Sequence, residues 1–121
     1  MSKVHNVEDD ELSQMTVKLM LKSLGYEVEV ASSGEEALAI LEKPDAEFSV
    51  ILTDLGMPNM GGLELAKRIR QSHFKAKDLP IIAITGDSSE NAKQQTIAAG
   101  MNGFLEKPVD IKTLASVLPK P

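Results

Sequence analysis

The sequence predicts a doubly wound α/β fold, in which five parallel strands form one sheet with helices on both faces. Two observations predict it. The apolar period switches between strand and helix five times within 121 residues, and the apolar runs at 48–53 and 80–84 are typical of strands buried on both faces. The flavodoxin-like (βα)5 sandwich, with strand order 2-1-3-4-5, fits best, because it places the half-polar second strand and the short fifth strand at the edges. We expect one domain over residues 1–121.

The first strand and helix are expected near the N-terminus. Residues 3–8 form a short extended segment, after which Leu12, Met15 and Leu19 recur at helical spacing. Gly25 is a typical C-terminal stop for that helix.

The second unit begins with an edge strand. Apolar and acidic residues alternate over 26–30, which indicates a half-solvated strand. The serines at 32–33 and the glutamates at 35–36 offer a capping box for a helix that carries Leu38 and Leu41.

The third and fourth strands are expected at the centre of the sheet. Residues 48–53 form the third strand, and a Gly61-Gly62 turn opens the helix that follows. A lysine-rich stretch at 73–79 is expected to be irregular. Residues 80–84 form the fourth strand, whose first residue is a proline, and proline is tolerated at that position.

The last part of the chain alternates in the same way. A fourth helix over about 88–99 has few large apolar residues, so we expect it to be weakly packed and mobile. Residues 103–106 form a short fifth strand, and Asp110 caps a last helix.

Composition excludes several functions. A formal net charge of -5 argues against a direct nucleic-acid binder or an anionic-membrane binder. With no cysteine, a disulfide framework and a thiolate metal site are excluded. No apolar stretch approaches the roughly 20 residues that span a bilayer, and the chain does not begin with a signal peptide. We expect a cytoplasmic protein.

Acidic side chains meet where the first and third strands end. Asp54 closes the third strand, and Glu8, Asp9, Asp10 and Glu11 follow the first. In the expected order these strands are neighbours, so their carboxyl ends lie side by side. Asp10 and Glu11 suit a helix start, whereas Glu8 and Asp9 are expected to point toward Asp54.

Three carboxylates at close range repel one another unless a cation intervenes. Mg²⁺ prefers such oxygen ligands, and no histidine pair or cysteine set competes for a softer metal, since His5 and His73 each stand alone. A magnesium site is the favoured interpretation. An acidic cluster without a metal, with Asp54 capping a loop, is the alternative.

Two further side chains reach the same edge of the sheet. Thr85 ends the fourth strand and Lys107 follows the fifth. Mg²⁺ and Lys107 would offset the charge of a phosphoryl group, Thr85 would donate a hydrogen bond to it, and Asp54 would attack in line. The residues therefore predict phosphoryl transfer to Asp54.

At these residues the whole chain resembles the receiver domain of two-component response regulators, in the CheY-like superfamily. The matching segments are Val7-Glu8-Asp9-Asp10, Asp54-Leu55-Gly56-Met57-Pro58, Thr85-Gly86 and Phe104-Leu105-Glu106-Lys107-Pro108.

The resemblance implies a phosphorelay function. Asp54 would accept a phosphoryl group from a phosphohistidine of a histidine kinase or a histidine phosphotransfer domain. Glu8, Asp9, Asp54 and a backbone carbonyl near Gly56 would hold Mg²⁺, and Lys107 would bind the phosphoryl oxygens. The resemblance implies a signalling phosphoacceptor that would catalyse its own phosphoryl transfer and dephosphorylation rather than a turnover enzyme, although the parent chain would itself be an enzyme if it is a hybrid histidine kinase.

The resemblance also assigns a switch. Thr85 and Phe104 would move together on phosphorylation, and the surface of the fourth helix, fifth strand and fifth helix would change its affinity for a downstream effector or output domain. Gly56 and Asp87 would tune dephosphorylation. Because Gly56 cannot shield the phosphoryl group, we expect a short-lived aspartyl phosphate.

Some features stay open. His5 and Asn6 stand where the family commonly has aliphatic residues, and we expect their polar groups to find partners in the core. The stretch 99–108 looks most like receivers of hybrid sensor histidine kinases. The chain is a stand-alone receiver, a receiver from a larger regulator, or the terminal receiver of a hybrid kinase.

Three other functions compete with phosphoacceptance. One is an interaction module that does not depend on phosphorylation, and another is an enzyme that hydrolyses small phosphate esters through Asp54. A flavin carrier of the same fold is the third, but acids stand where it would need a phosphate loop.

Overall fold

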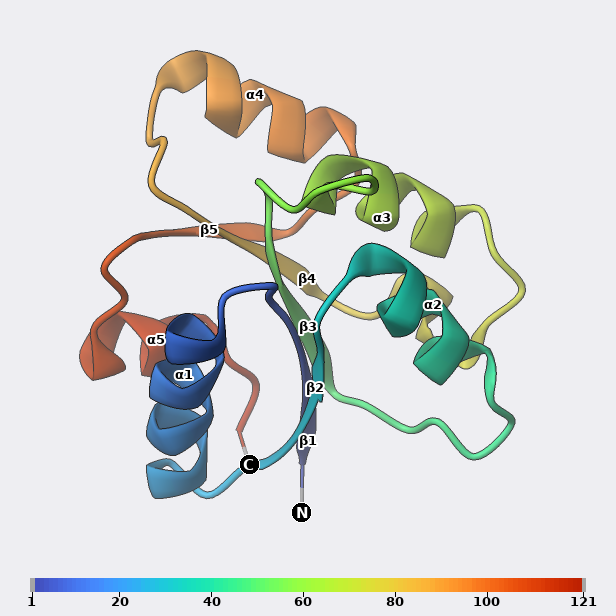
Figure 1. Cartoon of the computed structure of the whole chain (residues 1–121), viewed down its shortest axis with the longest axis horizontal. Helices are drawn as coiled ribbons and strands as arrows, with labels where there is room; N and C mark the ends of the chain where they lie inside the picture. Colours follow the sequence, from blue (N-terminus) through green and yellow to red (C-terminus); the bar gives the residue numbers. More distant parts are fainter. Residues whose placement is uncertain (1, 121) are drawn as a thin grey trace.

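The predicted architecture is confirmed by a computed structural model that describes residues 2–120. One parallel sheet has the strand order β2-β1-β3-β4-β5, with helices on both of its faces (Figure 1). The strands are β1 (Lys3–Val7), β2 (Glu27–Ala31), β3 (Val50–Asp54), β4 (Ile81–Thr85) and β5 (Gly103–Glu106). The helices are α1 (Glu11–Ser23), α2 (Gly34–Glu42), α3 (Gly62–Arg70), the 3₁₀ helix η1 (Lys75–Asp78), α4 (Glu90–Ala98) and α5 (Ile111–Val117). No helix within residues 2–120 is long and apolar enough to span a bilayer.

The two central strands lie slightly further along the chain than predicted. The third strand begins two residues later than the predicted 48–53 and includes Asp54, which pairs with Ile84. The fourth lies one residue beyond the predicted 80–84 and includes Thr85. Both functional candidates are therefore the last residues of strands, where the ladder limits backbone movement.

Two segments differ from the predicted outline. The stretch 73–79, expected to be irregular, contains η1. The fourth helix is shorter than the predicted 88–99, because Ser89 stands outside it as the N-cap and its hydroxyl accepts from the Ala92 N–H.

Helix ends follow local chemistry. Asp10, Ser33 and Asp110 are N-caps, and in each the side-chain oxygen accepts the backbone N–H three residues further on. Gly25 follows the end of α1 with a φ of 94°, a conformation that favours glycine. These ends agree with the sequence analysis.

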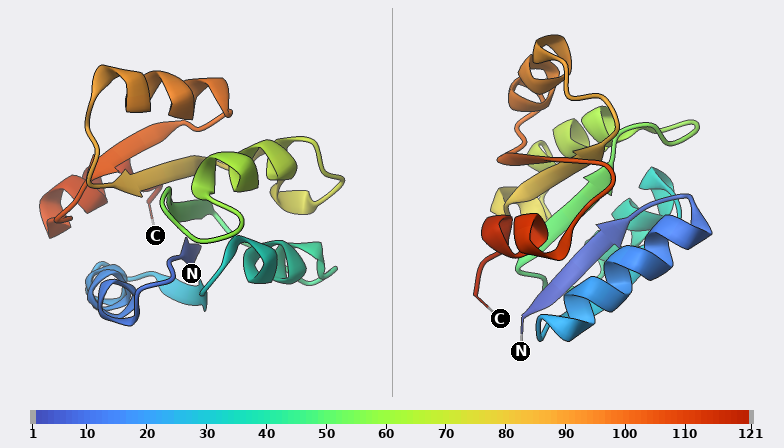
Figure 2. Two further views of the ribbon diagram at one scale, coloured as in Figure 1. Left: turned by 45° about the horizontal axis from the view of Figure 1, so that its top comes forward. Right: turned by 90° about the vertical axis from the view of Figure 1, so that its left-hand side faces the viewer.

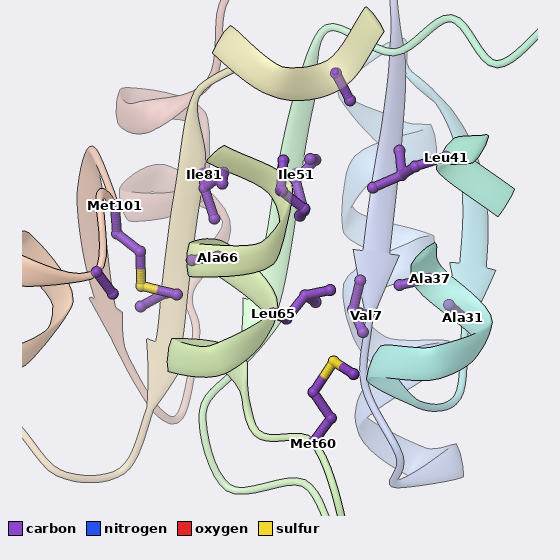
Figure 3. Close-up of a cluster of buried hydrophobic side chains, with 14 of the residues drawn as sticks. Val7, Ala31, Ala37, Leu41, Ile51, Met60, Leu65, Ala66, Ile81 and Met101 are labelled. Carbon is purple, nitrogen blue, oxygen red and sulfur yellow. The ribbon is translucent and has the colours of Figure 1, made fainter. Parts of the chain in front are cut away.

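Two apolar layers enclose the sheet. α1 and α5 cover one face, while α2 and α3 cover the other, and the right-hand view of Figure 2 shows the sheet between them. Figure 3 shows the layer under α2 and α3, where Leu41 and Leu65 lie against Val7 and Ile51 of the strands. Phe104 packs at the margin of this layer.

α4 packs weakly, as its composition predicts. Ala92 and Thr96 are its buried residues, and Ile97 leaves 66% of its surface exposed. The mobility of α4 stays a prediction.

The expectation that His5 and Asn6 find partners is only partly correct. The Nδ1 atom of His5 lies 3.1 Å from the carbonyl oxygen of Glu29, and its ring stacks on Phe48. The His5 Nε2 and Asn6 Nδ2 atoms have no hydrogen-bond partner among the described residues. Because β1 has a strand on each side and a helical layer on each face, few free acceptors reach these atoms. Burial lowers the pKa of His5 below its usual value.

Candidate functional site

The ends of β1 and β3 bring three carboxylates together. β1 pairs with β3 up to Val7 opposite Thr53, so the acids after each strand share one edge of the sheet. Carboxylate oxygens of Glu8, Asp9 and Asp54 all lie within 4.8 Å of one another. Their donor set is entirely carboxylate oxygen, which suits a hard divalent cation.

Two of these acids are largely buried. The side chains of Glu8 and Asp54 are 6% and 12% exposed. Burial raises the pKa of Glu8, and the negative charge of Asp54 adds to this, although the Asp10 N–H and Lys107 stabilise the carboxylate. Such a shift is common where a site concentrates charge for chemistry.

Lys107 supplies the opposite charge. Its Nζ atom lies 3.2 Å from Glu8 Oε1 and 3.5 Å from Asp54 Oδ1. Partial burial of the ammonium group opposes protonation, but the charges of Asp54 and Glu8 outweigh it and raise the pKa of Lys107. The Lys107 backbone N–H donates to the Thr85 carbonyl at 2.8 Å, so β4 fixes the point from which this side chain reaches across the site.

Thr85 and Asp87 connect the site to α4. The Thr85 side chain is buried at the end of β4, and its hydroxyl oxygen accepts the Asp87 N–H at 3.1 Å. Asp87 Oδ1 in turn accepts the Ser89 N–H at 2.9 Å, which lowers the pKa of Asp87. Asp87 therefore uses its carboxylate to shape the loop before α4.

Phe104 lies on β5 opposite Ala83 of β4. Its ring is half-buried, and Lys93 Nζ of α4 lies 5.9 Å from the ring centroid. Movement of this ring would change its contact with Lys93 and therefore the packing of α4.

The loop after Asp54 contains two glycines with different surroundings. A Cβ atom on Gly56, whose N–H lies 3.4 Å from Asp54 Oδ1, would meet nothing within 4 Å, so the space at this position beside Asp54 is open. A Cβ atom on Gly62 would lie 2.4 Å from the Asp54 carbonyl oxygen. α3 can therefore start against the strand that carries Asp54 only because Gly62 has no side chain. The sequence predicts Gly62 as a turn residue but does not indicate this contact.

Gln14 was also missed. Gln14 is the fourth residue of α1. Its side-chain amide donates to the backbone carbonyl of Glu8 and, at 3.1 Å, to the Ser32 hydroxyl. Its place one turn after the acidic run was the available signal.

Comparison with known proteins identifies the family. The response regulator receiver domain family matches residues 4–118. The CAI-1 autoinducer sensor kinase/phosphatase CqsS of Vibrio cholerae is 38% identical over 86% of this chain, and the sensor histidine kinase RcsC of Escherichia coli is 34% identical over 93%. This chain covers 15% and 11% of the lengths of those two relatives.

Solved structures agree. Chemotaxis protein CheY4 of Vibrio cholerae superposes with a TM-score of 0.88 at 39% identity, covering 96% of this chain and 94% of CheY4. The receiver domain of the Pseudomonas aeruginosa sensor histidine kinase PA1611, solved with a magnesium ion in its active-site cleft, has a TM-score of 0.84 at 28% identity, covering 96% and 93%. The chain belongs to the response regulator receiver domain family of two-component signalling.

Proposed function

We propose that Asp54 is the phosphoacceptor of this receiver domain. Its carboxylate oxygen would attack the phosphorus of a phosphohistidine, the new O–P bond forming as the N–P bond breaks and the electron pair returns to the imidazole nitrogen. The supporting observation is that Asp54 clusters with the acids Glu8 and Asp9 and has Lys107 Nζ 3.5 Å away. Lys107 would bind the transferred phosphoryl oxygens.

We assign Mg²⁺ binding to Glu8, Asp9, Asp54 and the backbone carbonyl at Gly56. The clustering of the three carboxylates and the raised pKa of Glu8 support this assignment, because a divalent cation relieves their repulsion. When bound, Mg²⁺ offsets the charge on phosphoryl oxygens.

The proposed donor is a histidine kinase or a histidine phosphotransfer domain. Leu12, Met15 and Leu19 are 73%, 61% and 62% exposed and lie on one side of α1, the helix that starts directly after the acids. A groove lined in part by Glu8, Leu12 and Lys107 joins the first of these apolar residues to the site. A partner that packs apolar side chains against α1 would therefore hold its phosphohistidine near Asp54. The absence of cysteine in the chain is compatible with a reducing compartment, and we propose a cytoplasmic location.

We further propose that phosphorylation switches the α4-β5-α5 surface. The Thr85 hydroxyl would leave the Asp87 N–H to bond the phosphoryl group, and Phe104 would turn inward behind it. A downstream effector or output domain would read the change. The open space at Gly56 and the engagement of Asp87 with Ser89 support rapid hydrolysis by water.

Phosphorylation with a small donor tests the proposal. The wild-type chain should gain one alkali-labile phosphoryl group from acetyl phosphate in the presence of Mg²⁺, while Asp54→Ala should gain none. If the wild-type chain gains no phosphoryl group, the phosphorylation-independent interaction module is favoured. Sustained hydrolysis of a phosphomonoester would favour the enzyme alternative.

A further inference from the structure

Gln14 connects three segments at the edge of the metal-binding acids. Its side chain leaves α1 and turns back toward the end of β1, where its Nε2 atom donates to the Glu8 carbonyl. The same atom lies 3.1 Å from the hydroxyl of Ser32, the residue before the N-cap of α2. Gln14 is half-buried, so this arrangement is partly shielded from water.

The contact matters because of the peptide unit that it holds. The Glu8 carbonyl belongs to the peptide between Glu8 and Asp9, and this peptide lies just beyond the last paired residue of β1. Its orientation sets the directions in which both side chains leave the backbone. On one side Glu8 is fixed by its N–H, which donates to the Ala31 carbonyl at 2.9 Å. On the other side its carbonyl depends on Gln14.

The helix itself does not need this side chain. The backbone N–H of Gln14 already donates to the Asp10 carbonyl at 2.9 Å, and the cap of α1 is made by Asp10 with Ser13. A donor aimed at the Glu8 carbonyl therefore adds nothing to helix capping. It adds rigidity to the loop that carries two of the three clustered carboxylates.

We propose that Gln14 is a positioning residue for metal binding, which pre-orients Glu8 and Asp9 toward Asp54. This rests on the proposed Mg²⁺ site and extends it to a residue that touches neither the metal nor the phosphoryl group. Ligands held in place before binding lose less conformational freedom when the cation arrives, so removal of Gln14 should weaken Mg²⁺ affinity more than it slows phosphoryl transfer.

Gln14→Met isolates the hydrogen bonds, because methionine keeps the length and helix propensity but has no donor. We expect the Kd for Mg²⁺, measured by calorimetry on the unphosphorylated chain, to rise about three- to tenfold, the range of one hydrogen bond. In the absence of metal, hydrogen exchange of the Asp9 backbone amide should be faster in Gln14→Met than in wild type. The rate of phosphorylation by acetyl phosphate at saturating Mg²⁺ should stay within about twofold of wild type.

Gln94→Met is the matched control, since the Gln94 amide donates within α4 to Glu90 and is remote in the fold from the acids. It should leave the Mg²⁺ affinity unchanged. A Gln14→Met chain that binds Mg²⁺ as tightly as wild type, whether or not it is less stable to heat, overturns the positioning role. Failure of the wild-type chain to bind Mg²⁺ would instead refute the proposed metal site.

Discussion

Lys107→Met should destabilise the metal-free chain, and Mg²⁺ should reverse much of the loss. In the folded protein the Lys107 ammonium is the cation closest to Glu8 and Asp54, at 3.2 and 3.5 Å. At an effective dielectric constant near 20, each contact corresponds to about 5 kcal/mol of gross attraction. Methionine has nearly the same length, so the change removes charge with little loss of packing.

The net loss is much smaller than the gross attraction. The Lys107 side chain is 34% exposed, so water screens it, whereas the two acids are largely buried. Exposed pairs contribute about 0.2–1 kcal/mol, and breaking a buried pair costs about 3–5 kcal/mol. We therefore expect a loss of about 1–3 kcal/mol, which corresponds to a Tm lower by about 3–15 °C for a chain of this size.

Urea unfolding followed by circular dichroism, with EDTA or with Mg²⁺, measures both parts of this prediction. Mg²⁺ should stabilise Lys107→Met more than wild type, because the variant has no resident cation to offset the three carboxylates. Lys3→Met is the matched control, because Lys3 pairs with the half-buried Glu29 at 2.9 Å, away from the site. The stability that this variant loses should not be restored by Mg²⁺. The reasoning fails if Mg²⁺ stabilises wild type at least as much as Lys107→Met.

Three further predictions concern the same fold. Gly62→Ala should lower the free energy of unfolding, measured with urea, by about 1–3 kcal/mol, because its Cβ would lie 2.4 Å from the Asp54 carbonyl oxygen. Gly56→Ala in the same loop should lower it much less. Equal losses in the two variants would contradict the close approach of α3 to Asp54. The free energy of unfolding should fall as the pH drops below about 6.5, since the unfolded chain protonates His5 more readily than the folded one. In His5→Phe, the urea midpoint should depend less on pH in this range. An unchanged pH dependence would contradict the role of His5. Gly56→Glu, which fills the open side of Asp54, should lengthen the lifetime of the aspartyl phosphate several-fold in a phosphate-release assay, and a shorter lifetime would refute the open-water interpretation.

Most of the fold was predictable because it depends on local signals. The alternation of apolar periods indicates strands and helices, and capping side chains such as Asp10 and Asp110 mark where helices begin. The strand order then follows from which strands are polar enough for an edge. The convergence of Asp54 with the acids after β1 is a consequence of that order.

The parts that sequence reasoning missed are contacts between distant segments. Nothing near Gln14 in the sequence shows that its amide reaches the Glu8 carbonyl, and nothing near Gly62 shows that α3 approaches the backbone of Asp54. The missing partner of His5 Nε2 is also a tertiary property, since it depends on what two helical layers and two neighbouring strands leave within reach. Such distances emerge only after the elements have packed.

The two ends of α4 are held unequally, and this bears on how a change at Asp54 would spread. At its C-terminal end the Arg70 guanidinium donates to the Gly100 carbonyl at 2.9 Å and to the Leu79 carbonyl at 2.7 Å, which ties the turn after α4 to α3 and to the start of β4. At its N-terminal end the loop is joined to the site through the Asp87 N–H and the Thr85 hydroxyl. A shift of that hydroxyl toward a phosphoryl group would break this bond and leave the Arg70 contacts intact. α4 buries only Ala92 and Thr96 among its described residues and leaves Ile97 66% exposed, so few contacts oppose its movement. The contacts therefore favour a pivot of α4 about its C-terminal end over a displacement of the whole helix.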